Sequence, residues 1–148
     1  MRRGFTLIEI LLATIILGLG LVGILTSMSQ AQRLMLYSNY YQTAQEVMDI
    51  GDMAYPLEDI KDPMMDIDID PERATTLWNK ISDERLTNEQ EKRFHGYTWE
   101  REWLNKNDDE EIERLGGLYI IKVTVRWGND RRGNEESDSY ITFWRKSE

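Results

Sequence analysis

The chain has 148 residues, a length that suits one small domain with a membrane segment, and it carries 27 acidic against 18 basic side chains. The resulting formal net charge of −9 argues against a nucleic-acid partner, because binding to phosphates requires a basic surface. The sequence contains no cysteine, which excludes disulfides and thiolate metal sites.

An uncharged apolar run lies near the N-terminus, because residues 10–28 contain no charged side chain. As a helix, residues 5–28 would be about 36 Å long, which is enough to cross a bilayer core of about 30 Å. Arg2 and Arg3 precede the run and favour a cytoplasmic N-terminus. We therefore expect a transmembrane segment at residues 5–28 and a soluble domain outside the cytoplasm at residues 29–148.

Two common classes of protein begin with basic residues and an apolar run, and each explains only part of this N-terminal sequence. A secretory signal peptide has an apolar core of about 7–15 residues, shorter than this one, although the small residues ending at Ala31 would suit cleavage. A plain signal anchor explains the length and the orientation. Neither class explains the carboxylate of Glu9 in the apolar run, or the abrupt start of that run at Phe5 after Gly4.

A third class accounts for both features. The sequence "GFTLIE" at residues 4–9 stands behind a short basic leader and begins an unbroken apolar helix. It resembles the processing signal of type IV pilins and of the pseudopilins of type II secretion systems, in which a prepilin peptidase cuts after the glycine and methylates the new N-terminus. The resemblance implies a leader at residues 1–4, cleavage between Gly4 and Phe5, and N-methylation of Phe5.

Glu9 would be the fifth residue of the processed chain. A carboxylate within a membrane needs a partner, and the methylated amino group of Phe5 would stay basic and therefore cationic. In this family the glutamate is usually paired with the N-terminus of the adjacent subunit. The resemblance therefore implies that Phe5 and Glu9 make the contact for filament assembly, while the helix dipole also favours a negative charge in the first turn.

An apolar stripe at helical spacing follows the membrane segment and comprises Leu34, Tyr37, Tyr41, Ala44 and Met48. It predicts one helix from Phe5 to about Ile50, with Gly51 as a possible end. The second half of this helix would pack its stripe on a sheet. The alternative is two helices with a break near Ser27–Ser29.

The segment "DPMMDIDIDPE" gives two signals, because Asp66, Asp68 and Asp70 alternate with isoleucines. Clustered carboxylates bind calcium, and some pseudopilins do so. Alternation at period two is also typical of a half-buried edge strand. We expect the edge strand, keep calcium as the less favoured alternative, and expect no other cofactor.

A short helix is predicted next, over "DPERATTLWNKIS". Asp70 would be its N-cap and Pro71 its first residue. Leu77, Trp78 and Ile81 would face inward, because they recur at helical spacing.

The C-terminal third shows the alternation of β-strands at residues 97–103, 118–127 and 139–144. A turn-rich loop joins the last two segments and predicts an antiparallel hairpin. In the last segment Ile141 and Phe143 share one face, and the other face holds Tyr140, Thr142 and Trp144. The apolar face of the two earlier strands holds Tyr97, Trp99, Trp103, Tyr119, Ile121, Val123, Val125 and Trp127.

Three strands with a shared apolar face can cover the stripe of the long helix. The expected fold is therefore α+β, with a long N-terminal helix packed on a small C-terminal antiparallel β-sheet. The first half of this helix would be transmembrane and the second half amphipathic.

No pattern in the sequence indicates catalysis. His95 is the sole histidine, which excludes a two-histidine metal site within one chain. A nucleophile elbow, a P-loop and a dinucleotide-binding fingerprint are absent, and carboxylate pairs arise by chance among so many acidic residues. We expect no catalytic residue and no small-molecule substrate.

The sequence therefore predicts a structural subunit. The short soluble part, the lack of cysteine and the closing aromatic strand look most like the I-type minor pseudopilin of a type II secretion system. Such a subunit is assembled from the bacterial inner membrane into a periplasmic filament and supports protein secretion. Its expected partners are prepilin peptidase, other pilin or pseudopilin subunits that contact the N-terminal helix, and the membrane.

Two alternatives remain at this point. The first is a minor pilin of a type IV pilus. The second is a binding module on a pilin-like helix, whose tryptophan-bearing sheet would be the binding face. Exposure of Trp99, Trp103 and Trp144 separates the binding module from a scaffold.

Overall fold

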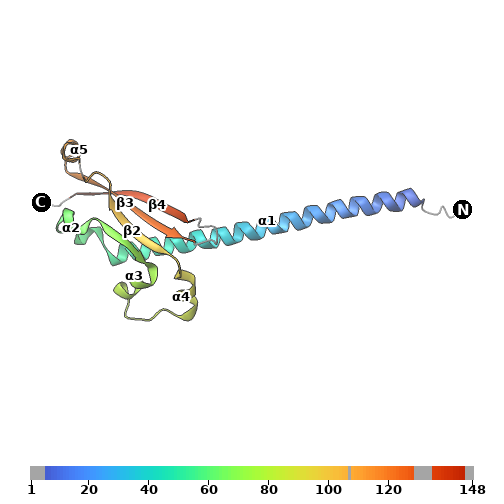
Figure 1. The fold of residues 1–148 in the computed structure, drawn as a ribbon, viewed down its shortest axis with the longest axis horizontal. Helices are drawn as coiled ribbons and strands as arrows, with labels where there is room; N and C mark the ends of the chain where they lie inside the picture. Colours follow the sequence, from blue (N-terminus) through green and yellow to red (C-terminus); the bar gives the residue numbers. More distant parts are fainter. Residues whose placement is uncertain (1–5, 107, 129–134, 146–148) are drawn as a thin grey trace. The chain divides into compact units, whose positions relative to one another are not determined.

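The fold is that of a computed structural model that describes residues 6–106, 108–128 and 135–145. The chain divides into two compact units, Met1–Tyr40 and Tyr41–Glu148. Figure 1 shows the order of the elements along the chain.

The longest element is helix α1 (Leu7–Ala54), which begins in the first unit and ends in the second. It runs without a break through Ser27–Ser29, so the prediction of one helix is confirmed and the two-helix alternative is wrong. The predicted start at Phe5 lies outside the described residues. The helix continues through Gly51, so the predicted end is too early.

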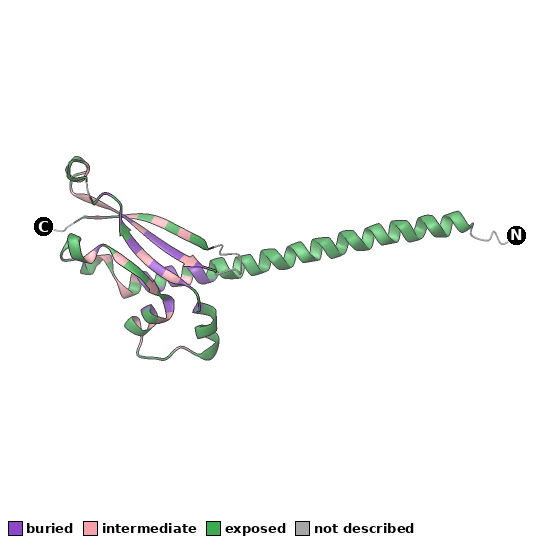
Figure 2. Cartoon of the chain, in the orientation of Figure 1, coloured by how far each residue is buried: buried purple, intermediate pink, exposed green. Residues whose placement is uncertain are grey.

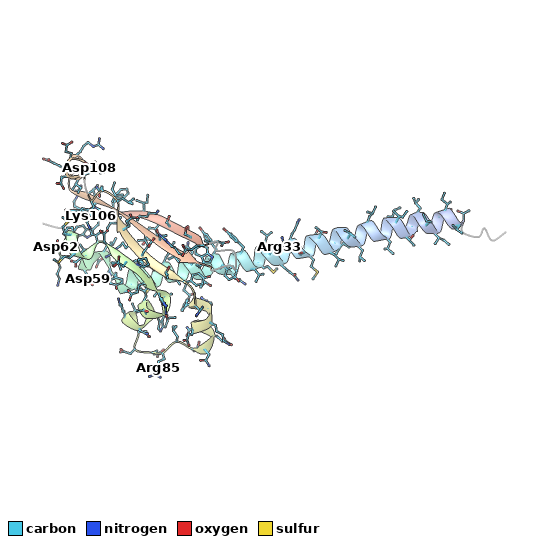
Figure 3. All side chains as sticks on the ribbon, viewed as in Figure 1. Arg33, Asp59, Asp62, Arg85, Lys106 and Asp108 are labelled. Carbon is cyan, nitrogen blue, oxygen red and sulfur yellow. The ribbon has the colours of Figure 1, made fainter. Side chains whose placement is uncertain are left out.

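Every described residue of the first unit is exposed, as Figure 2 shows. Its helix has an 18-residue window with a mean hydropathy of 2.5, long and apolar enough to cross a membrane. Arg33, labelled in Figure 3, is the single charged residue between Ile10 and Tyr40. The Thr26 hydroxyl donates to the carbonyl oxygen of Val22 at 2.8 Å, which satisfies a polar group that would otherwise be costly in hydrocarbon.

The second unit contains a four-stranded antiparallel sheet in the order β1-β2-β3-β4. Its strands are β1 (Ile69–Arg73), β2 (Thr98–Trp103), β3 (Leu118–Trp127) and β4 (Glu136–Arg145). The predicted hairpin is confirmed, because β3 and β4 pair without interruption from Leu118↔Arg145 to Trp127↔Glu136. The α+β prediction is therefore confirmed. The predicted edge strand is present as β1, but it begins only at Ile69, because Asp66 belongs to helix α2 (Pro63–Asp66).

Strand β1 corrects the predicted start of the short helix. Glu72 and Arg73 pair with Trp99 and Thr98 of β2, so the segment that begins at Asp70 is a strand. The helix that follows is α3 (Ala74–Ile81), with Arg73 as its N-cap. Leu77 is buried, as predicted, and Trp78 and Ile81 pack against the core. Pairing with β2 prevails here over the local helix-start signal.

Four further short helical elements are described: η1 (Leu57–Asp59), α2 (Pro63–Asp66), α4 (Asn88–Phe94) and α5 (Asp109–Arg114). Helix α4 begins with a capping box, in which the Thr87 hydroxyl accepts from the backbone N–H of Gln90 and the Gln90 side chain accepts from that of Thr87.

The core lies between the last turns of α1 and the inner face of the sheet, and Figure 2 shows the buried strands. Ala44 and Met48 of the predicted stripe are buried. Leu34 and Tyr37 are 70% and 55% exposed, so the prediction that they pack on the sheet is wrong. Tyr41 makes an edge-to-face contact with Trp127. The packed part of the helix thus begins about two turns later than the stripe suggested.

Gly51 allows α1 to pack directly against Trp99 of the sheet. A Cβ atom at this position would lie 2.3 Å from Nε1 of Trp99. The Trp99 side chain is fully buried and stacks on the ring of Tyr55, with ring centroids 5.7 Å apart. Glycine is required because of this contact and not because the helix ends there.

The tryptophans of the sheet do not form an exposed row. Trp99 is 0% exposed and Trp103 is 7% exposed. Trp144 is half-buried, and its ring contacts that of Tyr119. Because Trp99 and Trp103 are buried, this surface of the sheet is more consistent with a scaffold than with a binding face.

Candidate functional site

The predicted processing site lies at the start of α1. Gly4 and Phe5 fall outside the described residues, whereas Thr6 and Glu9 are described. Thr6 directly precedes the first helical residue, Leu7, and Glu9 is the third residue of the helix. This spacing is that of a capping box, in which an N-cap threonine and a glutamate three residues later satisfy free backbone donors.

The carboxylate of Glu9 accepts two hydrogen bonds from Thr6. The Thr6 backbone N–H donates to Oε2 at 2.8 Å, and the Thr6 hydroxyl donates to the same oxygen at 2.9 Å. A carboxylate in the first turn is also stabilised by the helix dipole. Sequence analysis missed Thr6 as a partner of Glu9, although the T-x-x-E spacing that indicates it was present in the motif.

The charge of Glu9 has no counterion among the described residues. All of the ion pairs that they form lie in the second unit. Both hydrogen bonds from Thr6 reach Oε2 and leave Oε1 without a protein donor in the described part of the chain. The site can therefore accept a further cationic donor, which is the chemistry that a free α-amino group provides.

Arg101 is the buried cation of the second unit. Its side chain is 4% exposed, and its guanidinium donates to three backbone carbonyl groups. The acceptors are Ile67 at 2.9 Å, Tyr55 at 2.7 Å and Asp66 at 2.7 Å. Burial lowers the pKa of Arg101, and the nearby carboxylate of Asp52 opposes that shift.

This role of Arg101 was not predicted, although the period-two alternation places it on the same face as Trp99 and Trp103. The signal that could have predicted it is a charged residue at a position of the strand where the alternation expects an apolar one. It joins the end of α1 to the segment around α2, which is a structural task.

Polar contacts also join α1 to β4. The Tyr140 hydroxyl donates to the carboxylate of Asp52, and Gln45 Nε2 donates to Asp138 Oδ2 at 2.7 Å. Burial raises the pKa of Asp52, and the hydrogen bond from Tyr140 opposes that rise. These contacts fix the flank of the helix against the last strand.

Two of the three candidate calcium residues, Asp66 and Asp68, are engaged in other contacts. Asp66 accepts from the backbone N–H groups of Lys61 and Asp62, each at 2.8 Å. Asp68 accepts from the backbone of Trp103 at 2.7 Å and from Lys106 Nζ at 2.6 Å. Within residues 6–106, 108–128 and 135–145, no three His, Asp or Glu side chains converge to hold a metal ion.

His95 lies at the end of α4, beside a shallow hollow that is lined by Asn88, Glu91 and Lys92. These residues do not include a hydroxyl or thiol nucleophile. The expectation that the chain has no catalytic residue stays a prediction.

Residues 1–25 match a protein family described as the prokaryotic N-terminal methylation motif. The match spans the predicted leader, the bond between Gly4 and Phe5, and Glu9. Comparison with curated proteins and with solved structures gives no match. The family assignment therefore rests on the N-terminal segment.

Proposed function

We propose that this type IV pilin-like protein, marked by its prepilin-type N-terminal methylation motif, is a structural minor pseudopilin of a type II secretion system. The motif indicates processing by prepilin peptidase and assembly with other pilin-like subunits. The long N-terminal helix on an antiparallel sheet is consistent with a pilin fold.

The observation that carries the proposal is the continuity of the motif with α1. The match at residues 1–25 includes the first turns of α1, which begins at Leu7. This helix is long and apolar enough to cross a membrane. In the proposed path, prepilin peptidase removes residues 1–4 and methylates Phe5. Glu9 then contacts the N-terminus of a neighbouring subunit during assembly.

The motif and the apolar helix are consistent with a single-pass, membrane-anchored protein. We place its N-terminus in the cytoplasm and its second unit in the periplasm of a bacterium, because Arg2 and Arg3 precede the apolar segment. Extraction from the inner membrane into a filament would then carry the second unit outward.

The pseudopilin assignment is supported by the small soluble part, the absence of cysteine and the closing aromatic strand. We propose a non-catalytic role without a cofactor, because the polar groups described above serve structural contacts. Burial of Trp99 and Trp103 supports a scaffold in preference to a binding module.

Processing is tested by producing the full chain with prepilin peptidase and measuring its intact mass. The wild-type chain should lose residues 1–4 and gain one methyl group at Phe5. Gly4→Ala should keep the leader. Gly18→Ala is the matched control, because a methyl group there meets no atom within 4 Å, and it should be processed normally. Processing of Gly4→Ala at the wild-type rate would contradict the proposed cleavage point.

Deletion of the gene in the source bacterium tests whether the protein serves a type II secretion system or a type IV pilus. The deletion is complemented with the wild-type or the Gly4→Ala chain. Loss of extracellular enzyme secretion, restored by the wild-type chain alone, supports a type II secretion pseudopilin. Intact secretion with loss of retractile pilus function would instead identify a minor pilin. The genes beside it, encoding a secretion channel or a retraction ATPase, should agree with the result.

A further inference from the structure

The two edges of the sheet differ in how they are protected against pairing with another strand. Edge strand β1 is five residues long and contains Pro71, which has no N–H to donate. Its register with β2 shifts between Ile69 and Glu72. A short length, a proline and an irregular register block an edge, so β1 is a poor template for a further strand.

Strand β4, at the opposite edge, is regular and unprotected. It is ten residues long, contains neither proline nor lysine, and pairs with β3 without a shift in register. Figure 1 shows it at the margin of the sheet, where no described strand pairs with its outer side. This edge can therefore accept a further strand.

The register identifies the backbone groups that β4 turns outward. The carbonyl oxygen of Ile120 accepts from the N–H of Leu104, and the Ile120 N–H donates to Oδ1 of Asn105, so the backbone of Ile120 faces β2. Phe143 lies opposite Ile120, and facing residues of an antiparallel pair turn their backbone groups either toward each other or apart. The N–H and C=O groups of Phe143, and by alternation those of Ile141, therefore point outward.

The face of β4 that lies away from α1 is apolar at its centre. Ile141 is 58% exposed and Phe143 is 59% exposed, and both lie on the side opposite Tyr140, which contacts α1. The apolar surface extends onto β3, because Phe143 lies opposite Ile120. Exposed apolar side chains on a regular edge strand are typical of an interaction surface.

The direction of β4 restricts which strand can reach it. Gln45 of α1 contacts Asp138, and the later residue Asp52 contacts the later residue Tyr140, so β4 runs in the same direction as this part of α1. Because neighbouring strands of the sheet are antiparallel, β1 at the other edge runs the opposite way.

Two pilin-like chains anchored in one membrane by their N-terminal segments are held in the same orientation. If their sheets also lie on the same side of the two long helices, β4 of one chain meets the edge of the other that corresponds to β1. The two strands are then antiparallel, and neither helix has to be reversed. A second copy of this chain does not suit the position, because its own β1 is blocked by Pro71 and by the shift in register.

We propose that β4 accepts, in antiparallel direction, the edge strand of a different pilin-like subunit that is anchored in the same membrane. Backbone hydrogen bonds continue the sheet into the partner, whose β-branched or aromatic side chains pack beside Ile141 and Phe143. Because β1 is blocked, this chain stands at one end of any row of paired sheets. The inference rests on the assembly with pilin-like subunits that is part of the proposed function, whichever machine the protein serves.

Photo-cross-linking of the full chain in membranes of the source bacterium tests the contact and its direction. A photoreactive benzoyl-phenylalanine replaces Ser139, Ile141 or Phe143 in turn, and mass spectrometry identifies the linked peptide. The adducts should contain another chain with a prepilin-type motif. As the probe moves from 139 to 143, the linked residue should move toward that partner's N-terminus. The same probe at Asp70, an exposed position of β1, is the matched control and should give no such series.

A proline variant tests the backbone contact. With the probe at residue 143, Ile141→Pro removes an outward N–H, whereas Ile141→Ala removes the side chain and keeps that N–H. The loss of one hydrogen bond should lower the adduct yield of Ile141→Pro roughly 2- to 10-fold below that of Ile141→Ala. Thermal unfolding of the two variants should be alike, because this N–H does not pair with β3. If Ile141→Pro unfolds at a lower temperature, the order of the linked residues decides alone.

Four results would overturn the proposal: no adduct from β4, linked residues in parallel order, adducts only with a second copy of this chain, or equal yields from two equally stable Ile141 variants. A probe at Ile16 in the apolar helix separates this inference from the proposed function. Adducts of Ile16 with a pilin-like subunit, without any from β4, would leave the proposed function standing and refute the β4 contact alone. Loss of both kinds of adduct would count against both.

Discussion

Glu9 shows how one carboxylate can hold an internal contact and still accept a second partner. Its Oε2 atom accepts both hydrogen bonds from Thr6, while Oε1 has no donor among the described residues. Cleavage after Gly4 would create a cationic amino group at Phe5, and a neighbouring chain would bring a second one. At the scale of single residues, the contact with Thr6 and the proposed assembly role therefore involve the same side chain and must be separated by mutation.

We expect Glu9→Ala to be processed normally but to fail to enter a filament, because it loses the charge that we propose to pair with a neighbour's N-terminus. Thr6→Ala loses the hydroxyl donor to Glu9, should cost about 1 kcal/mol of local helix stability, and should still assemble. Cross-linking to neighbouring subunits measures incorporation, and intact mass measures processing. Normal incorporation of Glu9→Ala would contradict the assembly role.

Gly51 is a second residue whose role depends on one contact. Gly51→Ala places a methyl group against the buried ring of Trp99. We expect a loss of about 1–3 kcal/mol in the free energy of unfolding, as is usual when a packed core is overfilled. Urea unfolding followed by tryptophan fluorescence measures it. Met53→Ala, at an exposed position of the same helix, is the control, and equal losses in both variants would contradict the packing argument.

At the scale of elements, Arg101 provides the positive charge and the hydrogen-bond donors that the end of α1 lacks. The last turn of this helix contains no basic residue, yet a helix C-terminus is stabilised by positive charge and by donors to its free carbonyl groups. Arg101 comes from β2 and donates to the carbonyl oxygens of Tyr55 and Asp66. One side chain thus ties the end of α1 and the end of α2 to the sheet.

We expect Arg101→Leu to lower the free energy of unfolding by about 3 kcal/mol or more, because it leaves several carbonyl groups without a donor. Arg101→Lys should recover only part of the loss, because an ammonium group lacks the planar fork. Arg126→Leu removes a more exposed arginine that pairs with Glu100, and it should cost about 1 kcal/mol or less. Comparable urea midpoints for Arg101→Leu and Arg126→Leu would contradict the structural role of Arg101.

At the scale of the whole molecule, the buried residues are confined to the second unit. Among the described residues the first buried side chain is Thr43, and every described residue before Tyr41 is exposed. The contacts that form the core therefore do not include the apolar helix of the first unit. This separation suits a protein whose first unit contacts lipid or neighbouring helices while the second unit lies in water.

We expect a fragment of residues 41–148 to fold alone, with a single cooperative thermal transition detected by tryptophan fluorescence. It retains Ala44, Val47 and Gly51, which pack against the sheet. A fragment of residues 52–148 lacks this part of α1 and should not fold, because the apolar face of the sheet would be uncovered. A cooperative transition in the shorter fragment would contradict the proposed core.

Local sequence patterns predicted the features that depend on neighbours along the chain. The motif around Gly4, Phe5 and Glu9 is contiguous, and the membrane helix follows from an uninterrupted apolar run. The β3–β4 hairpin was predictable because its strands alternate at period two and are joined by a turn-rich loop. Cleavage at Gly4 and methylation of Phe5 stay predictions, since both positions lie outside the described residues.

The tertiary structure decided the features that depend on contacts between distant segments. Asp70 and Pro71 carry a helix-start signal, yet pairing with β2 makes them a strand. Gly51 was predicted as a helix end, but its place beside the buried Trp99 ring shows that it allows α1 to pack closely on the sheet. Arg101 acquires its acceptors only when α1 and α2 meet β2. The sequence by itself determined the family signal and the membrane helix, because those are local. The core and the position of β4 at the edge of the sheet depend on contacts between distant segments. A local sequence pattern does not reveal the free energy of those contacts.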